Sequence, residues 1–209
     1  MDRQTRNPQN ETAMNVNLET GLTIGALIIS VSTIMMGVFQ YMKAQQWKKA
    51  EFVSKEIKEF YDNFDIKRAF VLLDWNSNEL ALKENEIDEK KKIYFTDDMI
   101  FSALTLNENK GNDLEGFCKE EVVIRSIFDG FFGWLIMFNS YIETKLVTAD
   151  DLKPYLIYWI QILADANNNK KPEKVREQIW KYIDASGFEP LRIFCSKFGY
   201  KDIKSLTKY

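Results

Sequence analysis

The stretch TGLTIGALIISVSTIMMGVFQYM, Thr20–Met42, decides how the whole chain is organised. Its 23 consecutive residues carry no charge, and charged residues, Glu19 and Lys43, border it on both sides. As an α-helix it would extend over about 34 Å, which exceeds the hydrocarbon thickness of a bilayer, about 30 Å. Buried helices of soluble proteins seldom run so far without a charged side chain. The sequence therefore predicts a membrane-spanning helix.

A cleaved signal peptide is the alternative explanation for an apolar segment near the N-terminus. Signal peptides place basic residues directly before an apolar run of about 7–15 residues and small residues at the cleavage site. Here no basic residue abuts Thr20, and no A-x-A-like site follows Met42. The pattern favours a membrane anchor over a signal peptide.

Basic residues flank the anchor unequally. Five lysines follow it within 16 residues, whereas only Arg3 and Arg6 precede it. Because Lys and Arg near a span are retained on the cytoplasmic side, residues 43–209 are expected to form a cytoplasmic domain. Residues 1–19 are polar and without periodicity, so we expect a disordered tail outside the cell. Met14, within this tail, is a second candidate for the true start of the chain.

Beyond the anchor, apolar residues recur every three or four positions, which is typical of amphipathic helices. We expect the anchor helix to continue to Tyr61, and further helices over about 65–75, from 97 onward, and over 117–146, 154–166, 173–185 and 190–198. Thr96 and Thr148, each followed by acidic residues, are typical helix caps. The segments ELALK (79–83) and KIYFT (92–96) alternate as in a short β-hairpin. The predicted fold is mostly α: one N-terminal transmembrane helix, then a soluble helical bundle with one short hairpin.

The run Phe117–Leu146 is the most apolar segment after the anchor, and we expect it to be the core helix. A second membrane span is the alternative. Arg125 and Asp129 interrupt the run and leave only Gly130–Ile142 without charge, which is too short to cross a bilayer. The sequence alone leaves open whether Gly130–Ile142 touches the membrane.

The composition excludes several classes of function. The chain has no histidine, which removes the commonest general base and the commonest transition-metal ligand. It has no phosphate-binding glycine loop and no nucleophile elbow. With 28 basic and 31 acidic residues, its net charge of -3 gives no field that would recruit nucleic acid. The sequence therefore predicts no catalytic residue, no cofactor site, no metal site and no nucleic-acid partner.

The remaining chemically suggestive residues have structural explanations that we prefer. Cys118 and Cys195 lie far apart in apolar contexts and are expected to be buried free thiols. The acidic pairs 97–98 and 150–151 stand at helix starts, where the helix dipole favours carboxylates. Arg125 and Asp129 are expected to form a buried ion pair, with a polar pocket as the alternative. The tryptophans are spread one per major helix and are expected in the core: Trp47, Trp75, Trp134, Trp159 and Trp180.

The anchor, the segment QWKKAEFVSKEIKEF (46–60), LLDWNS (72–77) and DLKPYLIYWI (151–160) resemble a group of uncharacterised bacterial proteins, common in cyanobacteria. The resemblance covers about Met14–Gly199. It implies a membrane helix followed by a helical domain and is compatible with a start at Met14. The group has no assigned activity, so the resemblance places no catalytic or binding residue on this chain.

These observations favour a membrane-tethered interaction module whose cytoplasmic helical domain binds a protein partner or a second copy of itself. Its expected partners are thus the lipid bilayer and a protein. The alternative hypothesis is a small carboxylate-dependent, membrane-anchored enzyme or effector with a polar pocket near Arg125 and Asp129. A third hypothesis is a binder of lipid surfaces that acts through Lys43, Lys48 and Lys49.

Overall fold

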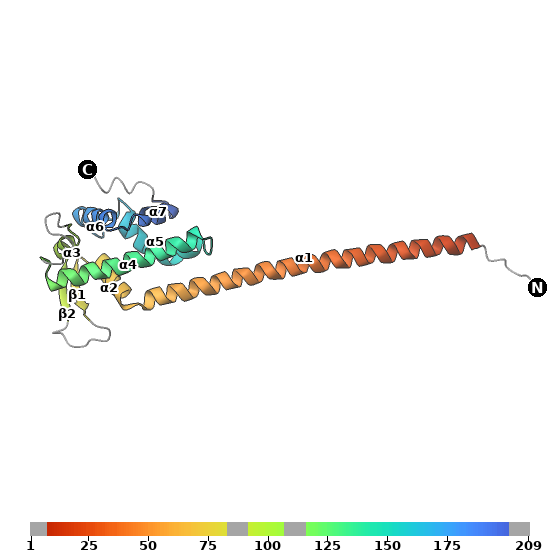
Figure 1. Ribbon diagram of the computed structural model, residues 1–209, viewed down its shortest axis with the longest axis horizontal. Helices are drawn as coiled ribbons and strands as arrows, with labels where there is room; N and C mark the ends of the chain where they lie inside the picture. The colour runs from red at the N-terminus through yellow and green to blue at the C-terminus, as the bar shows by residue number, and fades with distance from the viewer. Residues whose placement is uncertain (1–7, 83–91, 107–115, 201–209) are drawn as a thin grey trace, which may run out of the picture. The chain divides into compact units, whose positions relative to one another are not determined.

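A computed structural model describes residues 8–82, 92–106 and 116–200, with only the backbone for residues 8–20. The chain divides into two units, residues 1–51 and 52–209. The described part is mostly helical and has one two-stranded antiparallel sheet, as predicted (Figure 1). Its elements are α1 Pro8–Asp62, α2 Phe64–Asp74, β1 Ser77–Ala81, β2 Lys92–Thr96, α3 Asp97–Ala103, α4 Lys119–Glu143, α5 Ala149–Ala164, α6 Glu173–Ala185 and α7 Pro190–Lys197.

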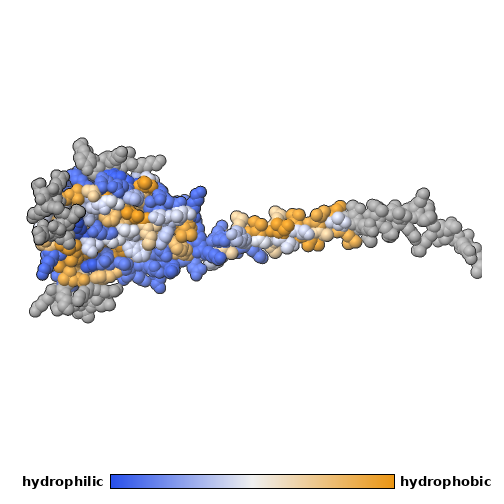
Figure 2. Space-filling model, in the orientation of Figure 1, coloured by the Kyte–Doolittle hydropathy of each residue, from blue (hydrophilic) through white to orange (hydrophobic). Residues whose placement is uncertain are grey.

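The first unit consists of α1 up to Glu51, and its apolar side chains are exposed. Leu27, Ile28 and Ile29 are consecutive, so they point in three directions around the helix, yet they are 61%, 61% and 68% exposed. Figure 2 shows the apolar residues of this helix in orange. Within the described residues, it is the one helix long and apolar enough to cross a membrane.

Helix α1 begins at Pro8, earlier than expected. Residues 8–19, which we expected to be disordered, are therefore helical in the structure. Two physical reasons account for the difference. Proline is well tolerated in the first helical turn, and once the apolar segment has formed a helix, each further residue adds a hydrogen bond without a new nucleation step.

The second unit is built around α4, as the sequence predicted. Helices α2, α3 and α7 pack on α4, and in the view of Figure 1 the hairpin lies on the opposite side of α4 from α6 and α7. The segment Gly130–Ile142 lies in the middle of this core: Phe131, Phe132, Leu135 and Phe138 are fully buried. The last turns of α1 join it through Phe60, whose ring centroid lies 5.3 Å from that of Phe138.

Local signals of the sequence set the boundaries of several elements. The Thr96 hydroxyl accepts a 3.3 Å hydrogen bond from the Met99 amide and so caps α3. The Thr148 hydroxyl caps α5 in the same way by accepting from the Asp151 amide, and the Asp151 carboxylate accepts a 2.7 Å hydrogen bond from the Thr148 amide, which completes a capping box. In the hairpin, Ser77 pairs with Thr96 and Ala81 with Lys92. The predicted caps are confirmed, and the predicted hairpin is present, with its first strand at Ser77–Ala81 where the sequence predicted 79–83.

Candidate functional site

Arg125 and Asp129, the pair singled out from the sequence, meet through a third residue. The Arg125 Nε donates to the Tyr182 hydroxyl at 3.2 Å, and that hydroxyl donates to Asp129 Oδ1 at 2.5 Å. Within the described residues, the two charged groups form no direct ion pair. Burial and the bond to Asp129 raise the pKa of Tyr182. The expected direct pair is thus replaced by a tyrosine bridge that fastens α6 to α4.

The two cysteines differ in environment. Cys195 is buried as expected, and burial raises its pKa to about 12. Cys118 is exposed, so the prediction of a buried thiol was wrong there. The physical reason is its place at the cap of α4, before the apolar face of the helix begins; its amide donates to Glu121 Oε2 at 2.8 Å.

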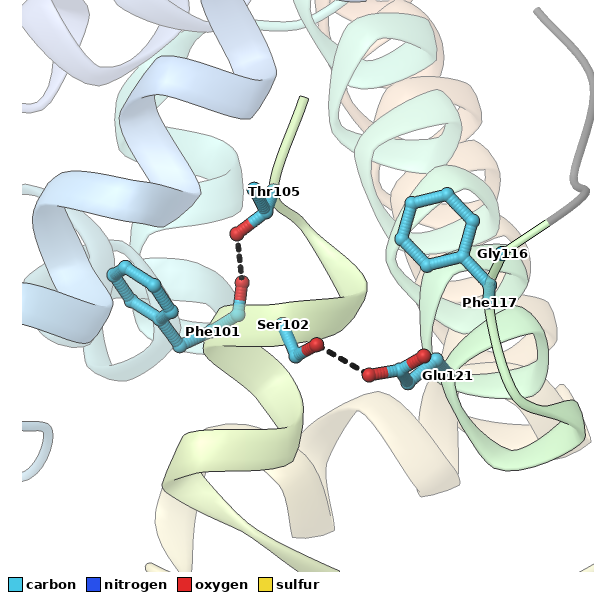
Figure 3. A pocket seen from close by; sticks show the side chains of 6 residues that line it. All are labelled: Phe101, Ser102, Thr105, Gly116, Phe117 and Glu121. Carbon is cyan, nitrogen blue, oxygen red and sulfur yellow. Dashed lines mark hydrogen bonds between the residues drawn. The ribbon is translucent and has the colours of Figure 1, made fainter. Parts of the chain in front are cut away.

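A small pocket of about 260 Å³ lies between α3 and the start of α4 (Figure 3). Its lining residues are Phe101, Ser102, Thr105, Gly116, Phe117 and Glu121. Figure 3 shows the Ser102 hydroxyl directed at the Glu121 carboxylate, to which it donates a hydrogen bond. This bond lowers the pKa of Glu121, and the bond from the Cys118 amide adds to the effect. Glu121 is therefore a weak base that serves as a helix cap, and the pocket offers little chemistry.

A second concavity, of about 390 Å³, is lined by polar residues and is called here the polar cleft. One wall is the end of α2 and the start of β1, and the other is the loop between α5 and α6. Its lining residues are Asp74, Trp75, Asn76, Ser77, Asn169 and Lys170. Trp75 ends α2 because its backbone is extended, and its amide donates to the Val71 carbonyl at 3.1 Å.

The acidic group of the polar cleft is held from two sides. Asp74 Oδ1 accepts hydrogen bonds from the Tyr158 hydroxyl and, at 3.0 Å, from Lys170 Nζ. The Tyr158 bond and then Lys170 lower the pKa of Asp74, while the Asp74 carboxylate raises the pKa of Tyr158. Asp74 is thus a fixed carboxylate, and its Oδ2 has no hydrogen-bond partner in the described part of the chain.

The buried Lys171 side chain bonds residues of both neighbouring segments beside the polar cleft. The side chain of Lys171 is 0% exposed, and its Nζ donates to Asp97 Oδ1 at 2.6 Å and to the Trp75 carbonyl. Burial lowers the pKa of Lys171, and the bond to Asp97 opposes this shift. Asp97 therefore does more than the helix-start role expected of it. Sequence reasoning missed Lys171 because it stands in the polar segment NNNKKP, which reads as a solvated loop.

The tryptophans occupy more varied positions than predicted. Trp180 is fully buried, and Trp134 and Trp159 pack against the core. Trp47 and Trp75 are 70% and 55% exposed, so the prediction of core packing was wrong for both. Trp47 lies on a turn of α1 that no other element of its unit covers, and Trp75 follows the last helical residue of α2.

In the described ranges, no three acidic or cysteine side chains come together where they could hold a metal ion. Comparison of the chain with protein-family models, with curated proteins and with solved structures gives no match.

Proposed function

We propose that this chain is a membrane-tethered interaction module: α1 holds it in a bilayer, and its helical domain binds a protein partner or a second copy of itself. The exposed apolar surface of α1 carries the proposal. Each Å² of apolar surface in water is unfavourable by about 25 cal/mol. A partner helix would cover one stripe of α1, whereas Leu27, Ile28 and Ile29 are exposed in three directions. Hydrocarbon covers all of them at once.

The polar side chains of the proposed span are compatible with hydrocarbon. The Ser30 hydroxyl donates to the Ala26 carbonyl at 2.8 Å, and the Thr33 hydroxyl donates to the Ile29 carbonyl at 2.8 Å. Both hydroxyls are therefore satisfied within the helix and need no water. The signal-sequence alternative predicts a mature chain without Thr20–Met42, so mass spectrometry of the protein purified from membranes separates the two.

The orientation we propose places the helical domain in the cytoplasm, since the lysines that follow the span outnumber the two arginines before it. An alkaline phosphatase fused after Tyr209 should then be inactive, and a green fluorescent protein fused there should fluoresce. An active phosphatase fusion would contradict this orientation.

The binding role is supported by large apolar side chains that the domain leaves exposed: Tyr94, Leu146, Tyr155, Tyr158 and Ile193. They lie on β2, after α4, on α5 and on α7, and we propose that one or more of them contact the partner. A photo-crosslinking residue placed in turn at Tyr94, Tyr155 and Ile193 of the full chain in membranes should trap one discrete species at one or more positions. The same residue at Lys153, an exposed polar position of α5, is the matched control.

A crosslink at the apolar positions but not at Lys153 would support the proposal, and its mass would separate a second copy from another protein. The proposal fails if none of the positions yields a crosslink and the purified chain sediments as a monomer. The carboxylate-dependent alternative gains no support from Arg125 and Asp129, because Tyr182 occupies the place between them.

A further inference from the structure

We propose that the turns of α1 next to the proposed span bind the headgroups of anionic phospholipids through Lys43, Lys48 and Lys49, called here the lysine collar. This inference rests on the proposed membrane anchor and goes beyond it, because it names the class of lipid that surrounds the anchor. Three features of α1 carry it: the position of its charges along the helix, the position of the lysines around the helix axis, and two exposed aromatic side chains.

Basic charge is concentrated in the turns of α1 that directly follow the span. Between Glu19 and Glu51 the sequence has no charged residue other than the three lysines of the collar, so no carboxylate in this stretch offsets them. Residues 51–62 carry four acidic and two basic residues, which reverses the sign farther from the span. The other end of the span is bordered by Glu19 instead of a lysine. The net positive charge therefore lies beside one end of the span.

The lysines of the collar surround the helix. Because α1 is one helix from Pro8 to Asp62, each residue advances by about 100° around its axis. Measured from Lys43, Lys48 lies at about 140° and Lys49 at about 240°. A helix that lies flat on a membrane needs its basic residues on one side, whereas a helix that crosses the membrane meets headgroups on every side. The collar fits a crossing helix.

The collar lies near the depth of the headgroups. At about 1.5 Å per residue, Lys43 lies about 1.5 Å beyond Met42, and Lys48 and Lys49 lie about 9–10 Å beyond it. The headgroup layer is about 5–7.5 Å thick on each side of the hydrocarbon. Side chains of a helix lean toward its N-terminus, which in α1 is the direction of the span, and a long lysine stem extends this reach. All three ammonium groups can thus contact lipid phosphates.

Two exposed aromatic side chains lie in the same part of α1. Tyr41 and Trp47 are 65% and 70% exposed. Tyrosine and tryptophan are enriched at membrane–water interfaces, where the ring meets apolar groups and the polar edge meets water. A tryptophan between Lys43 and Lys48 is unfavourably placed in water and favourably placed among headgroups. Trp47 therefore supports, independently of the lysines, the position of these turns in the headgroup layer.

Charge complementarity determines which lipid the collar prefers. Phosphatidylglycerol has a net negative charge, whereas phosphatidylcholine is zwitterionic. The attraction between lysines and anionic lipids falls off within a Debye length, which is about 10 Å at 0.1 M salt. Lys55 and Lys58, two lysines farther along α1, lie about 20 and 24 Å beyond Met42 and should contribute little.

The experiment places the full chain in phosphatidylcholine bilayers with a trace of spin-labelled phosphatidylglycerol or spin-labelled phosphatidylcholine. Electron paramagnetic resonance separates lipids whose motion is restricted by contact with the protein from the bulk lipid. We expect the chain to prefer phosphatidylglycerol by about twofold or more at low salt, and to lose this preference in about 1 M salt. A preference that persists unchanged in high salt would overturn the inference.

Two double variants locate the preference on the chain. Lys43→Gln with Lys48→Gln should abolish most of it. The matched control, Lys55→Gln with Lys58→Gln, removes the same charge from exposed positions of the same helix and should leave the preference unchanged. Glutamine is a good helix former, so both variants keep α1.

Equal effects of the two double variants would overturn the inference. Equal restricted fractions of the two spin-labelled lipids would also overturn it, while leaving the membrane anchor in place. If neither lipid shows a restricted fraction, the proposed anchor fails together with the inference.

Discussion

The Lys171 ammonium lies 2.6 Å from the Asp97 carboxylate, and the Lys171 side chain has no exposure to solvent. These residues are 74 positions apart in the chain. Their pairing fixes the loop between α5 and α6 to the junction of β2 and α3, and the further bond to the Trp75 carbonyl brings in the end of α2. Three segments that line or support the polar cleft thus depend on one buried cation.

Removal of this cation should destabilise the domain strongly. Lys171→Met leaves the Asp97 carboxylate without its buried partner, and we expect the free energy of unfolding to fall by about 3–5 kcal/mol. Lys174→Met is the control, because Lys174 pairs with Asp98 at 2.7 Å but the two side chains are 61% and 80% exposed. Lys174→Met should lower the free energy of unfolding by at most about 1 kcal/mol. Chemical denaturation of the full chain in detergent, followed by tryptophan fluorescence, measures both. Equal effects of the two substitutions would contradict the structural role of Lys171.

The tyrosine bridge predicts that Arg125 and Asp129 act on stability through Tyr182. Tyr182→Phe keeps the ring but removes both hydrogen bonds, and we expect it to lower the free energy of unfolding by about 1–3 kcal/mol. A double-mutant cycle of Arg125→Ala and Asp129→Ala should show coupling in the wild-type background and much less with Phe at position 182. Coupling of the same size in both backgrounds would mean that the two charges interact directly.

The contact between α1 and α4 within the domain predicts a loss of stability at high pH. The Tyr141 hydroxyl donates to Glu56 Oε2 at 2.9 Å, and burial, followed by this bond, raises the pKa of Tyr141 from 10.0 to about 12. When folding raises the pKa of a group, its protonated form stabilises the native state fully at pH values below the pKa of the unfolded chain. This contribution is lost as the pH rises through the pKa of the folded chain.

The free energy of unfolding should therefore fall between pH 10 and 12, the two pKa values of Tyr141. Tyr141→Phe should make this fall shallower, because Tyr141 no longer ionises, and should lower stability at neutral pH by about 1.5–3 kcal/mol through the loss of a bond to a carboxylate. Denaturation curves at a series of pH values measure both effects. The assignment is wrong if the wild type and the variant keep parallel pH profiles.

The two thiols should react very differently. Cys118 is exposed, whereas Cys195 is buried and has a pKa of about 12, so its reactive thiolate is scarce at neutral pH. A thiol reagent should label the native chain at one position and the unfolded chain at both. Cys118→Ser should abolish labelling of the native chain, and Cys195→Ser should leave it unchanged. Rapid native labelling of the Cys118→Ser variant would show that Cys195 is accessible.

Features encoded over a few residues were predictable from the sequence. The Thr96 and Thr148 caps follow from a hydroxyl placed beside acids at a helix start, and the hairpin follows from two alternating segments. The apolar composition of Phe117–Leu146 predicted the core helix, whereas the sequence left open whether Gly130–Ile142 touches the membrane. For the caps and the strands, the signal and its structural effect lie within about one helical turn or one strand.

Features that depend on contacts between distant residues were not predictable. Nothing near Lys171 marks it as buried, since its partner Asp97 is 74 positions away. The same holds for the Tyr182 bridge, which reaches Asp129 across 53 positions. Exposure of Trp75 follows from the end of α2, whereas composition predicts a tryptophan in the core. The polar cleft is assembled from two such segments, so sequence reasoning found no part of it.

We propose that α1 anchors the chain in a bilayer, and extraction of membranes at alkaline pH tests this anchoring. The full chain should remain in the membrane pellet after a carbonate wash and should be released only by detergent. Replacement of Ile28 and Ile29 by Lys places two charges in the proposed span, each unfavourable by about 2.5–3.5 kcal/mol, and should shift the chain to the soluble fraction. Recovery of the unsubstituted chain in the soluble fraction, or its release by carbonate alone, would show that α1 does not anchor the chain in a bilayer.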